Sequence, residues 1–175
     1  MVRPGLCKQR ESRSPMVTNP LRERSLVQNM ALAARLAAQA VIAPVAYGAH
    51  AMIEDGEGRL LLVRHTYMPG WFFPGGGVNR GEPALDAVTR ELKEEIGLQG
   101  FATCELFGLY TRKHFWTTNV IALFHIKGAT FDFKRNFEIA EAEFFPLDAP
   151  PKGIGRGPLR RFEERATGKE KSGYW

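Results

Sequence analysis

The sequence predicts an α+β fold in which helices cover a mixed β-sheet. Strand-like segments rich in Phe, Val, Ile and Leu are separated by turn signals, and only a few segments have helical periodicity. The 175 residues contain no internal repeat and no linker that would divide them into two domains. With 44% hydrophobic and 25% charged residues, the chain has the composition of a globular protein, which excludes a fibrous or wholly disordered one.

The N-terminal part of the chain is predicted to lie outside the main domain. Residues 1–20 contain three prolines and many polar residues, so we expect a disordered basic tail there. Residues 21–43 are predicted to form a helix that ends before Pro44 and packs on the domain. The overlapping stretch 30–49 also resembles a signal peptide. It is rich in Ala rather than Leu and is interrupted by Arg35, which favours the helix and argues against stable membrane insertion.

Residues 44–150 are predicted to form the main domain, which begins with a β-hairpin. The hairpin strands, residues 45–54 and 59–65, flank a short polar turn that contains two glycines. Three further strands are predicted at residues 101–112, 118–127 and 138–146. Residues 151–175 are predicted to contain a C-terminal helix, over residues 157–166, followed by a basic polar tail.

Residues 83–96 have clear helical periodicity, and Gly97 follows as a typical helix stop. The predicted core face of this helix consists of Leu85, Val88, Leu92 and Ile96. Three carboxylates gather on another sector of the same helix: Glu91, Glu94 and Glu95. Like charges at this spacing destabilise a helix by a few tenths of a kcal/mol per pair. Bound Mg²⁺, which takes oxygen ligands and shares substrate phosphates, would offset this repulsion. A solvated acidic face is the alternative.

Two features beside the carboxylates suit an anion or metal site. Gly75, Gly76 and Gly77 lie just upstream, and glycines let backbone groups approach an anion or metal closely, although a tight turn explains them equally well. Arg90 could hold one of the carboxylates in place. Its alternative is a surface ion pair with Glu94 or with Asp86.

Charge and cysteine content bear on partners and location. Residues 1–24 and 152–175 each carry a net charge of +4 while the whole chain carries +5, so the middle is mildly acidic. We expect solvated basic ends and no nucleic-acid partner, because no basic patch is interleaved with aromatic residues. Cys7 and Cys104 make no disulfide framework, so a cytoplasmic location is the default expectation.

The segment from Gly76 to Leu98 resembles the Nudix box, G-x5-E-x7-R-E-U-x-E-E-x-G-U with U aliphatic. Every specified position is present, and those inside the segment are Glu82, Arg90, Glu91, Leu92, Glu94, Glu95 and Gly97. The resemblance extends over about residues 45–150. It implies an α/β/α sandwich with a mixed β-sheet and a catalytic loop-helix-loop. It also implies hydrolysis of a nucleoside diphosphate linked to another group, X, with the help of Mg²⁺ or Mn²⁺.

The resemblance further implies roles for individual residues. The expected metal ligands are Glu91, Glu94, Glu95 and the backbone carbonyl of Gly75. Glu82 is expected to assist through water, and Arg90 to orient a glutamate. The candidates for the general base are Glu94, then Glu138 and Glu141.

Residues outside the box could contact the nucleotide. Three aromatic side chains could stack on a base: Trp71, Phe115 and Trp116. Three cationic ones could meet phosphates: Arg64, Arg112 and Lys113. Ordinary core packing and surface charge explain the same residues, so these roles stay open.

Three functions remain open from the sequence. The first is an Mg²⁺-dependent diphosphatase whose partner is a small nucleotide, and the intact box favours it. The second is a nucleotide- or metabolite-binding module with the same fold and little catalysis. The third is an RNA-end pyrophosphohydrolase that uses the basic ends. A homodimer is also left open.

Overall fold

The computed structural model describes residues 25–42 and 44–175, so the predicted tail at residues 1–20 lies outside the described residues. The first element is α1 (Leu26–Ile42), which confirms a helix in this part of the chain. The chain divides into two compact units between Gln39 and Ala40. The packing of α1 on the domain therefore stays a prediction. Among the described residues, no helix has the length and apolar character needed to cross a membrane.

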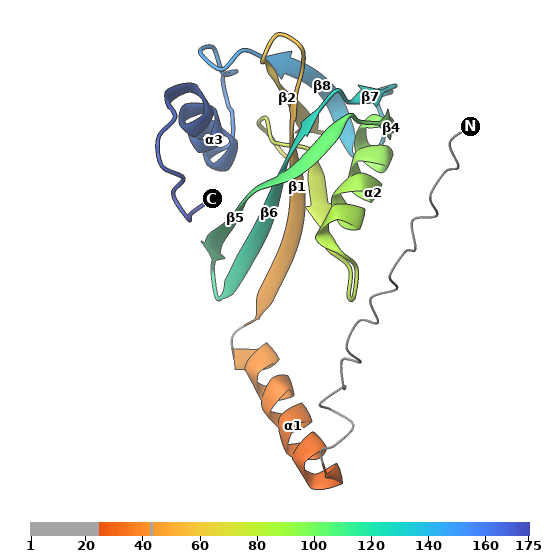
Figure 1. Cartoon of the computed structure of the whole chain (residues 1–175), viewed down its shortest axis with the longest axis vertical. Helices are drawn as coiled ribbons and strands as arrows, with labels where there is room; N and C mark the ends of the chain where they lie inside the picture. The colour runs from red at the N-terminus through yellow and green to blue at the C-terminus, as the bar shows by residue number, and fades with distance from the viewer. Residues whose placement is uncertain (1–24, 43) are drawn as a thin grey trace, which may run out of the picture. The chain divides into compact units, whose positions relative to one another are not determined.

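A mixed β-sheet forms the centre of the second unit (Figure 1). Its strands run in the order β5-β6-β1-β2-β8, and β3 also pairs with β1. The strands are β1 (Val45–Glu54), β2 (Leu60–His65), β3 (Gly75–Gly77), β5 (Thr103–His114), β6 (Thr117–Lys127) and β8 (Ile139–Phe145). β1 and β6 are parallel, whereas β1 and β2 form the predicted antiparallel hairpin. A separate small sheet pairs β4 (Leu98–Gly100) with β7 (Thr130–Phe131).

The two faces of the sheet carry two separate hydrophobic cores. Side chains alternate across a strand, so neighbouring residues of β1 face opposite sides. Ile53 packs in one core with the apolar face of α2 (Ala84–Ile96). Met52 packs in the other with Phe162 of α3 (Arg156–Thr167). Figure 1 shows α2 and α3 on opposite sides of the sheet. The predicted α+β fold with an α/β/α sandwich is confirmed.

The predicted core face of α2 needs one correction. Val88, Leu92 and Ile96 are fully buried, but Leu85 is 44% exposed. Leu85 lies in the first turn, where Ala84 and not Leu85 packs against the core, and the buried positions are completed by Ala87 and Glu95. The helix ends as predicted at Gly97, which has a left-handed conformation with φ 68° and donates its N–H to the carbonyl of Lys93.

The C-terminal residues extend the sheet. The sequence predicts only a basic solvated tail after the final helix, but the N–H of Thr111 on β5 donates to Gly173 O at 2.9 Å. The N–H of Trp175 in turn donates to Thr111 O at 2.9 Å. Residues 172–175, which we call the C-terminal strap, therefore line the edge strand β5.

Candidate functional site

The glycine loop at β3 lies directly on β1. Gly76 is paired with Ala49 in antiparallel register. Gly75 has φ 132°, and a Cβ built on it would lie 2.3 Å from Ala49 O. Both the conformation and the close approach require glycine at position 75. The loop is thus fixed to the central strand, with its other side turned toward α2.

The same loop leaves room for Glu91 on α2. A Cβ on Gly76 would lie 2.5 Å from the carboxyl carbon of Glu91. By contrast, a Cβ on Gly77 would meet nothing within 4 Å. Of these two neighbouring glycines, only Gly76 is needed for the carboxylate to sit against the loop.

Glu95 is a buried carboxyl group that holds the loop from the helix. It is 3% exposed, and its Oε2 accepts the N–H of Gly75 at 2.7 Å. The pKa of Glu95 is raised to about 8, first by burial and then by the nearby carboxylates, Glu91 first among them, while the Gly75 hydrogen bond acts in the opposite direction. Such a group has a high free-energy cost of ionisation unless a cation is bound beside it.

Arg90 links the parts of the loop-helix-loop. Its Nε and Nη2 donate to Glu82 at 2.9 and 3.0 Å, and its Nη1 donates to Glu91 Oε1 at 2.7 Å. Its Nη2 also donates to the carbonyl of Gly77 at 3.0 Å. Hydrogen bonding to Arg90 lowers the pKa of Glu82 to about 2. The principal partner of Arg90 is therefore Glu82 rather than Asp86 or Glu94, whose Oε2 lies 3.5 Å away.

The candidates for the general base are placed differently. The side chain of Glu94 is 59% exposed on the outer side of α2. Glu138 is exposed and precedes β8, and its charge contributes to the raised pKa of Glu95, so it faces the same region. Glu141 forms a two-bond ion pair with Arg64 across β2 and β8, which gives both residues a structural partner.

The carboxylates suit a divalent cation, although they are not arranged as a finished metal site. In the part of the chain that the structure describes, no three acidic, histidine or cysteine side chains converge on one point. Glu91 and Glu95 nevertheless face the same glycine loop, one against Gly76 and the other bonded to Gly75. A hard cation with oxygen ligands would offset the mutual repulsion that raises the pKa of Glu95.

A cavity of about 480 Å³ opens beside the glycine loop. Gly76 and Gly77 form one side of it, and rings of His50, Phe72 and Trp175 contribute to the others. Burial lowers the pKa of His50 to about 4, despite the opposing effect of the Phe73 backbone, so its imidazole is neutral near pH 7. This is the size and mixed polarity of a small-ligand site.

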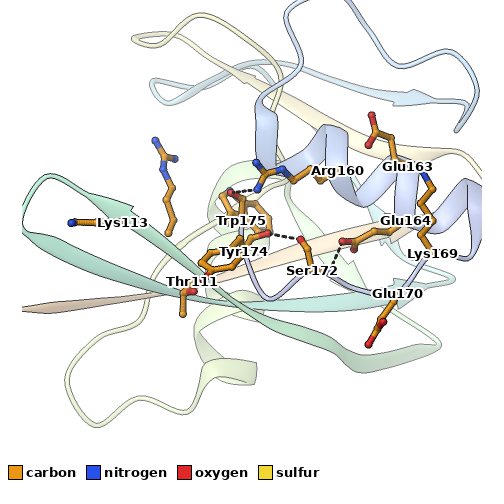
Figure 2. A pocket seen from close by; sticks show the side chains of 11 residues that line it. Thr111, Lys113, Arg160, Glu163, Glu164, Lys169, Glu170, Ser172, Tyr174 and Trp175 are labelled. Atoms are coloured by element: carbon orange, nitrogen blue, oxygen red, sulfur yellow. Dashed lines mark hydrogen bonds between the residues drawn. The ribbon is translucent and has the colours of Figure 1, made fainter.

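A larger cavity, of about 640 Å³, lies between β5 and α3 (Figure 2). Its lining contains four cationic and three acidic side chains, and the glycine loop does not contribute to it. We place the chemistry at the smaller cavity, because that one adjoins the carboxylates of α2.

Of the other residues predicted to contact the nucleotide, some line a cavity and others do not. Arg112 lines the cavity beside the glycine loop, whereas Lys113 lines only the larger one. Trp71 packs against Phe145 at 4.9 Å between ring centroids and lines neither cavity. Phe115 and Trp116 lie at the turn between β5 and β6, where Trp116 is 86% exposed.

His50 and Trp175 are among the cavity residues that were not predicted from the sequence. His50 lies on β1 four positions before Glu54, within a mostly apolar strand, and the sequence offers no signal for it. Trp175 reaches the cavity only because the C-terminal strap pairs with β5, a contact between residues far apart in the chain.

Known proteins with similar sequences share parts of this chain. The family model of the NUDIX domain matches residues 45–165. An RNA pyrophosphohydrolase of Hydrogenovibrio crunogenus is 46% identical over 48 residues, which cover 27% of this chain and 29% of that protein. A putative 8-oxo-dGTP diphosphatase of Bacillus subtilis is 35% identical over 68 residues, covering 39% and 45%. The m7GpppN-mRNA hydrolase dcap-2 of Caenorhabditis elegans is 31% identical over 118 residues, covering 60% and 14%. This chain thus matches less than half the length of each of these relatives.

Solved structures show the same fold. A MutT NUDIX hydrolase from Burkholderia pseudomallei superposes with a TM-score of 0.61 at 23% identity, over 68% of this chain and 96% of that one. A UDP-X diphosphatase superposes with a TM-score of 0.57 at 22% identity, over 83% and 74%. At these identities the likeness concerns the fold alone. The family model, in contrast, spans well over half of the chain, and the protein therefore belongs to the Nudix hydrolase family.

Proposed function

We propose that this protein is a metal-dependent pyrophosphohydrolase that cleaves the diphosphate linkage of a small nucleotide, a nucleoside diphosphate linked to a group X. The observation that carries the proposal is the buried carboxyl group of Glu95, which is bonded to the glycine loop beside Glu91 and next to a nucleotide-sized cavity. Nudix hydrolases generally use divalent metal ions, and these carboxylates would hold Mg²⁺, or Mn²⁺ in its place.

Each residue of the box has a distinct part in this proposal. The ligands would be Glu91, Glu94, Glu95 and the carbonyl of Gly75. Arg90 is a positioning residue, because it fixes Oε1 of Glu91 at 2.7 Å while Glu82 fixes Arg90. The bound cation would neutralise charge on the diphosphate.

The proposed reaction is a hydrolysis that consumes only the substrate and one water molecule. A water oxygen forms a bond to one phosphorus, and the bond from that phosphorus to the bridging oxygen breaks. The products are two phosphate compounds, for example a nucleoside monophosphate and X-phosphate. The proton from the water passes to Glu94 or Glu138, the two exposed carboxylates near Glu95.

A second candidate, hydrolysis at an RNA 5′ end, is motivated by the relatives named RNA pyrophosphohydrolase. These matches cover only 27% of this chain, so they do not separate an RNA end from a free nucleotide. Hydrolysis of a triphosphorylated RNA that weakens steeply with salt would favour this candidate.

The test is turnover with Mg²⁺ of dNTPs, ADP-ribose, NADH, nucleotide sugars, dinucleoside polyphosphates and a 5′-triphosphorylated RNA. We expect Glu95→Gln to lower turnover by about 100-fold or more, because it removes charge from the metal site. Its melting temperature should be kept or raised, because repulsion among the carboxylates is relieved. Glu57→Gln, which changes an exposed carboxylate in the β1–β2 turn, is the matched control. Unchanged turnover in Glu95→Gln at the same Mg²⁺ concentration would refute the assignment.

A further inference from the structure

The C-terminal strap is built into the fold and does not lie loosely on it. Besides its two backbone bonds with β5, it is held by Arg161 of α3, which is fully buried. Nη2 of Arg161 donates to Ser172 Oγ at 3.2 Å and to Tyr174 O at 3.3 Å. Figure 2 shows the strap between β5 and α3, with Arg160 donating to the carbonyl of Trp175 at 3.1 Å.

These contacts fix the indole ring of Trp175. The ring stacks on His50 with 5.7 Å between centroids and an interplanar angle of 25°. Tyr110 and Phe73 surround it at 5.8 and 6.3 Å. Gly157 of α3 lies so close that a Cβ there would be 2.2 Å from the indole Nε1. The ring therefore has little freedom to move.

Trp175 also borders three hollows of the surface. It lines the 480 Å³ cavity beside the glycine loop, the 640 Å³ cavity between β5 and α3, and a third one next to Gly155 and Pro158. Arg112 is the other side chain that lines all three. A residue of the strap is thus part of the boundary of the space beside the glycine loop.

The chemistry of this cavity matches the nucleoside part of a nucleotide. Its walls include aromatic rings, among them those of Tyr47, His50 and Phe72, and planar bases have π-faces that pack on such rings. Arg112 and Asn119 add a cation and an amide at the same cavity. Gly76 and Gly77 connect it to the carboxylates of α2, so a base here would leave its diphosphate beside them.

From this placement we infer that the cavity receives the base of the substrate and that Trp175 is a specificity-determining residue. The strap holds its indole as the rear wall, and that wall selects bases by size. This inference rests on the proposed function, which supplies the diphosphate at the glycine loop. It goes beyond the Nudix box, because the strap lies outside the NUDIX match at residues 45–165.

The experiment compares substrate preference in three variants: Trp175→Ala, Trp175→Phe and Trp71→Phe. The readout is the ratio of kcat/KM between the best and the poorest of dATP, dGTP, dCTP and dTTP. A variant that merely lowers the folded fraction reduces all four values by one factor and leaves the ratio unchanged. We expect Trp175→Ala to compress the ratio about tenfold, chiefly through KM, which is the scale of discrimination that a pocket of fixed size supplies. Trp175→Phe should compress it less.

Trp71→Phe is the matched control, because Trp71 packs in the same core but lines none of the three cavities. It should keep the parent ratio. A ratio that stays at the parent value in Trp175→Ala would overturn the inference, and so would an equal change in Trp71→Phe.

Failure of the proposed function would be seen separately. If the parent protein hydrolyses none of the four nucleotides, the inference is tested by the melting temperature with AMP, GMP, CMP and UMP, which requires no turnover. A rise that depends on the base in the parent and becomes uniform in Trp175→Ala would support it. No rise with any of the four, or the same order of rises in both proteins, would refute it.

Discussion

Two helices on opposite faces of the sheet each use one arginine to hold a chain segment at the cavity, and the two arginines differ in burial. Arg90 on α2 is 31% exposed and binds Glu82, Glu91 and the carbonyl of Gly77. Arg161 on α3 is fully buried and binds Glu164 and the C-terminal strap. We expect the loss of the partly exposed Arg90 to cost less in folding than the loss of the buried Arg161, which leaves buried partners unpaired.

The largest effect on stability is expected at Arg161. Its guanidinium donates to Glu164 at 2.7 Å and lies 3.9 Å above the ring of Tyr110. Arg161→Leu leaves the mostly buried carboxylate of Glu164 without its cation, so we expect the free energy of unfolding in urea to fall by about 3–5 kcal/mol. Arg160→Leu is the control. Arg160 is the neighbour of Arg161 in the chain, but its side chain is exposed and donates to Trp175 O. That variant should lose under about 1 kcal/mol. Equal losses in the two variants would remove the contrast between the buried and the exposed arginine.

A smaller effect, on activity and not on folding, is expected at Arg90. Arg90→Ala releases Oε1 of Glu91, so we expect turnover to fall about 10- to 100-fold, as for other residues that orient metal ligands. The melting temperature near pH 7 should fall only slightly. Arg90→Lys keeps the charge but loses the planar two-bond contact with Glu82, and should recover activity in part.

Arg90→Ala should also change how the stability of the protein depends on pH. The pKa of Glu82 is lowered from its ordinary value of 4.5 to about 2, first by hydrogen bonding to Arg90 and then by the N–H of Asn79. A lowered pKa contributes stability above pH 4.5 and loses it as the pH falls toward 2. The stability difference between the parent and Arg90→Ala should therefore shrink over that interval. NMR titration of Glu82 in the variant should give a pKa nearer the ordinary value, and an unchanged pKa would show that Arg90 is not its main partner.

The two regions also differ in how far the sequence predicts them. The contacts of Arg90 join residues within one continuous segment, so fixed spacing predicts the loop, the helix and its stop at Gly97. The helix cap and the buried Val88, Leu92 and Ile96 confirm that interpretation. The error at Leu85 arises because helical periodicity alone does not show how far around the helix the buried face extends, and Ala84 packs against the core in place of Leu85.

The C-terminal region depends instead on contacts between distant residues. The sequence predicts a helix near residues 157–166, and α3 confirms it, but the pairing of the strap with β5 has no local pattern. Lysines and glycines between α3 and Trp175 are typical of a solvated tail. Only the fold brings Trp175 beside His50, and the proposed base-binding wall therefore cannot be predicted from spacing.

Two glycine substitutions, one beside α2 and one on α3, compare the two regions through the smallest expected effects. A Cβ at Gly157 would meet the rigid indole of Trp175, 2.2 Å from Nε1, whereas a Cβ at Gly76 would meet the flexible carboxylate of Glu91. Overpacking against a ring costs about 1–3 kcal/mol, so Gly157→Ala should lower the free energy of unfolding by that amount. Gly76→Ala should leave stability nearly unchanged, because the carboxylate can rotate away.

The displaced carboxylate gives Gly76→Ala its own effect on turnover. Moving Glu91 off the loop should lower activity about tenfold, since a displacement of this size at a metal ligand is costly for catalysis. Gly77→Ala is the control, because a Cβ there meets nothing within 4 Å, and it should lose much less activity. Unfolding in urea and initial rates at saturating Mg²⁺ would be measured for all three variants. If Gly76→Ala lost stability and Gly157→Ala lost only activity, the assignment of catalysis to the α2 side and of structural support to the α3 side would be reversed.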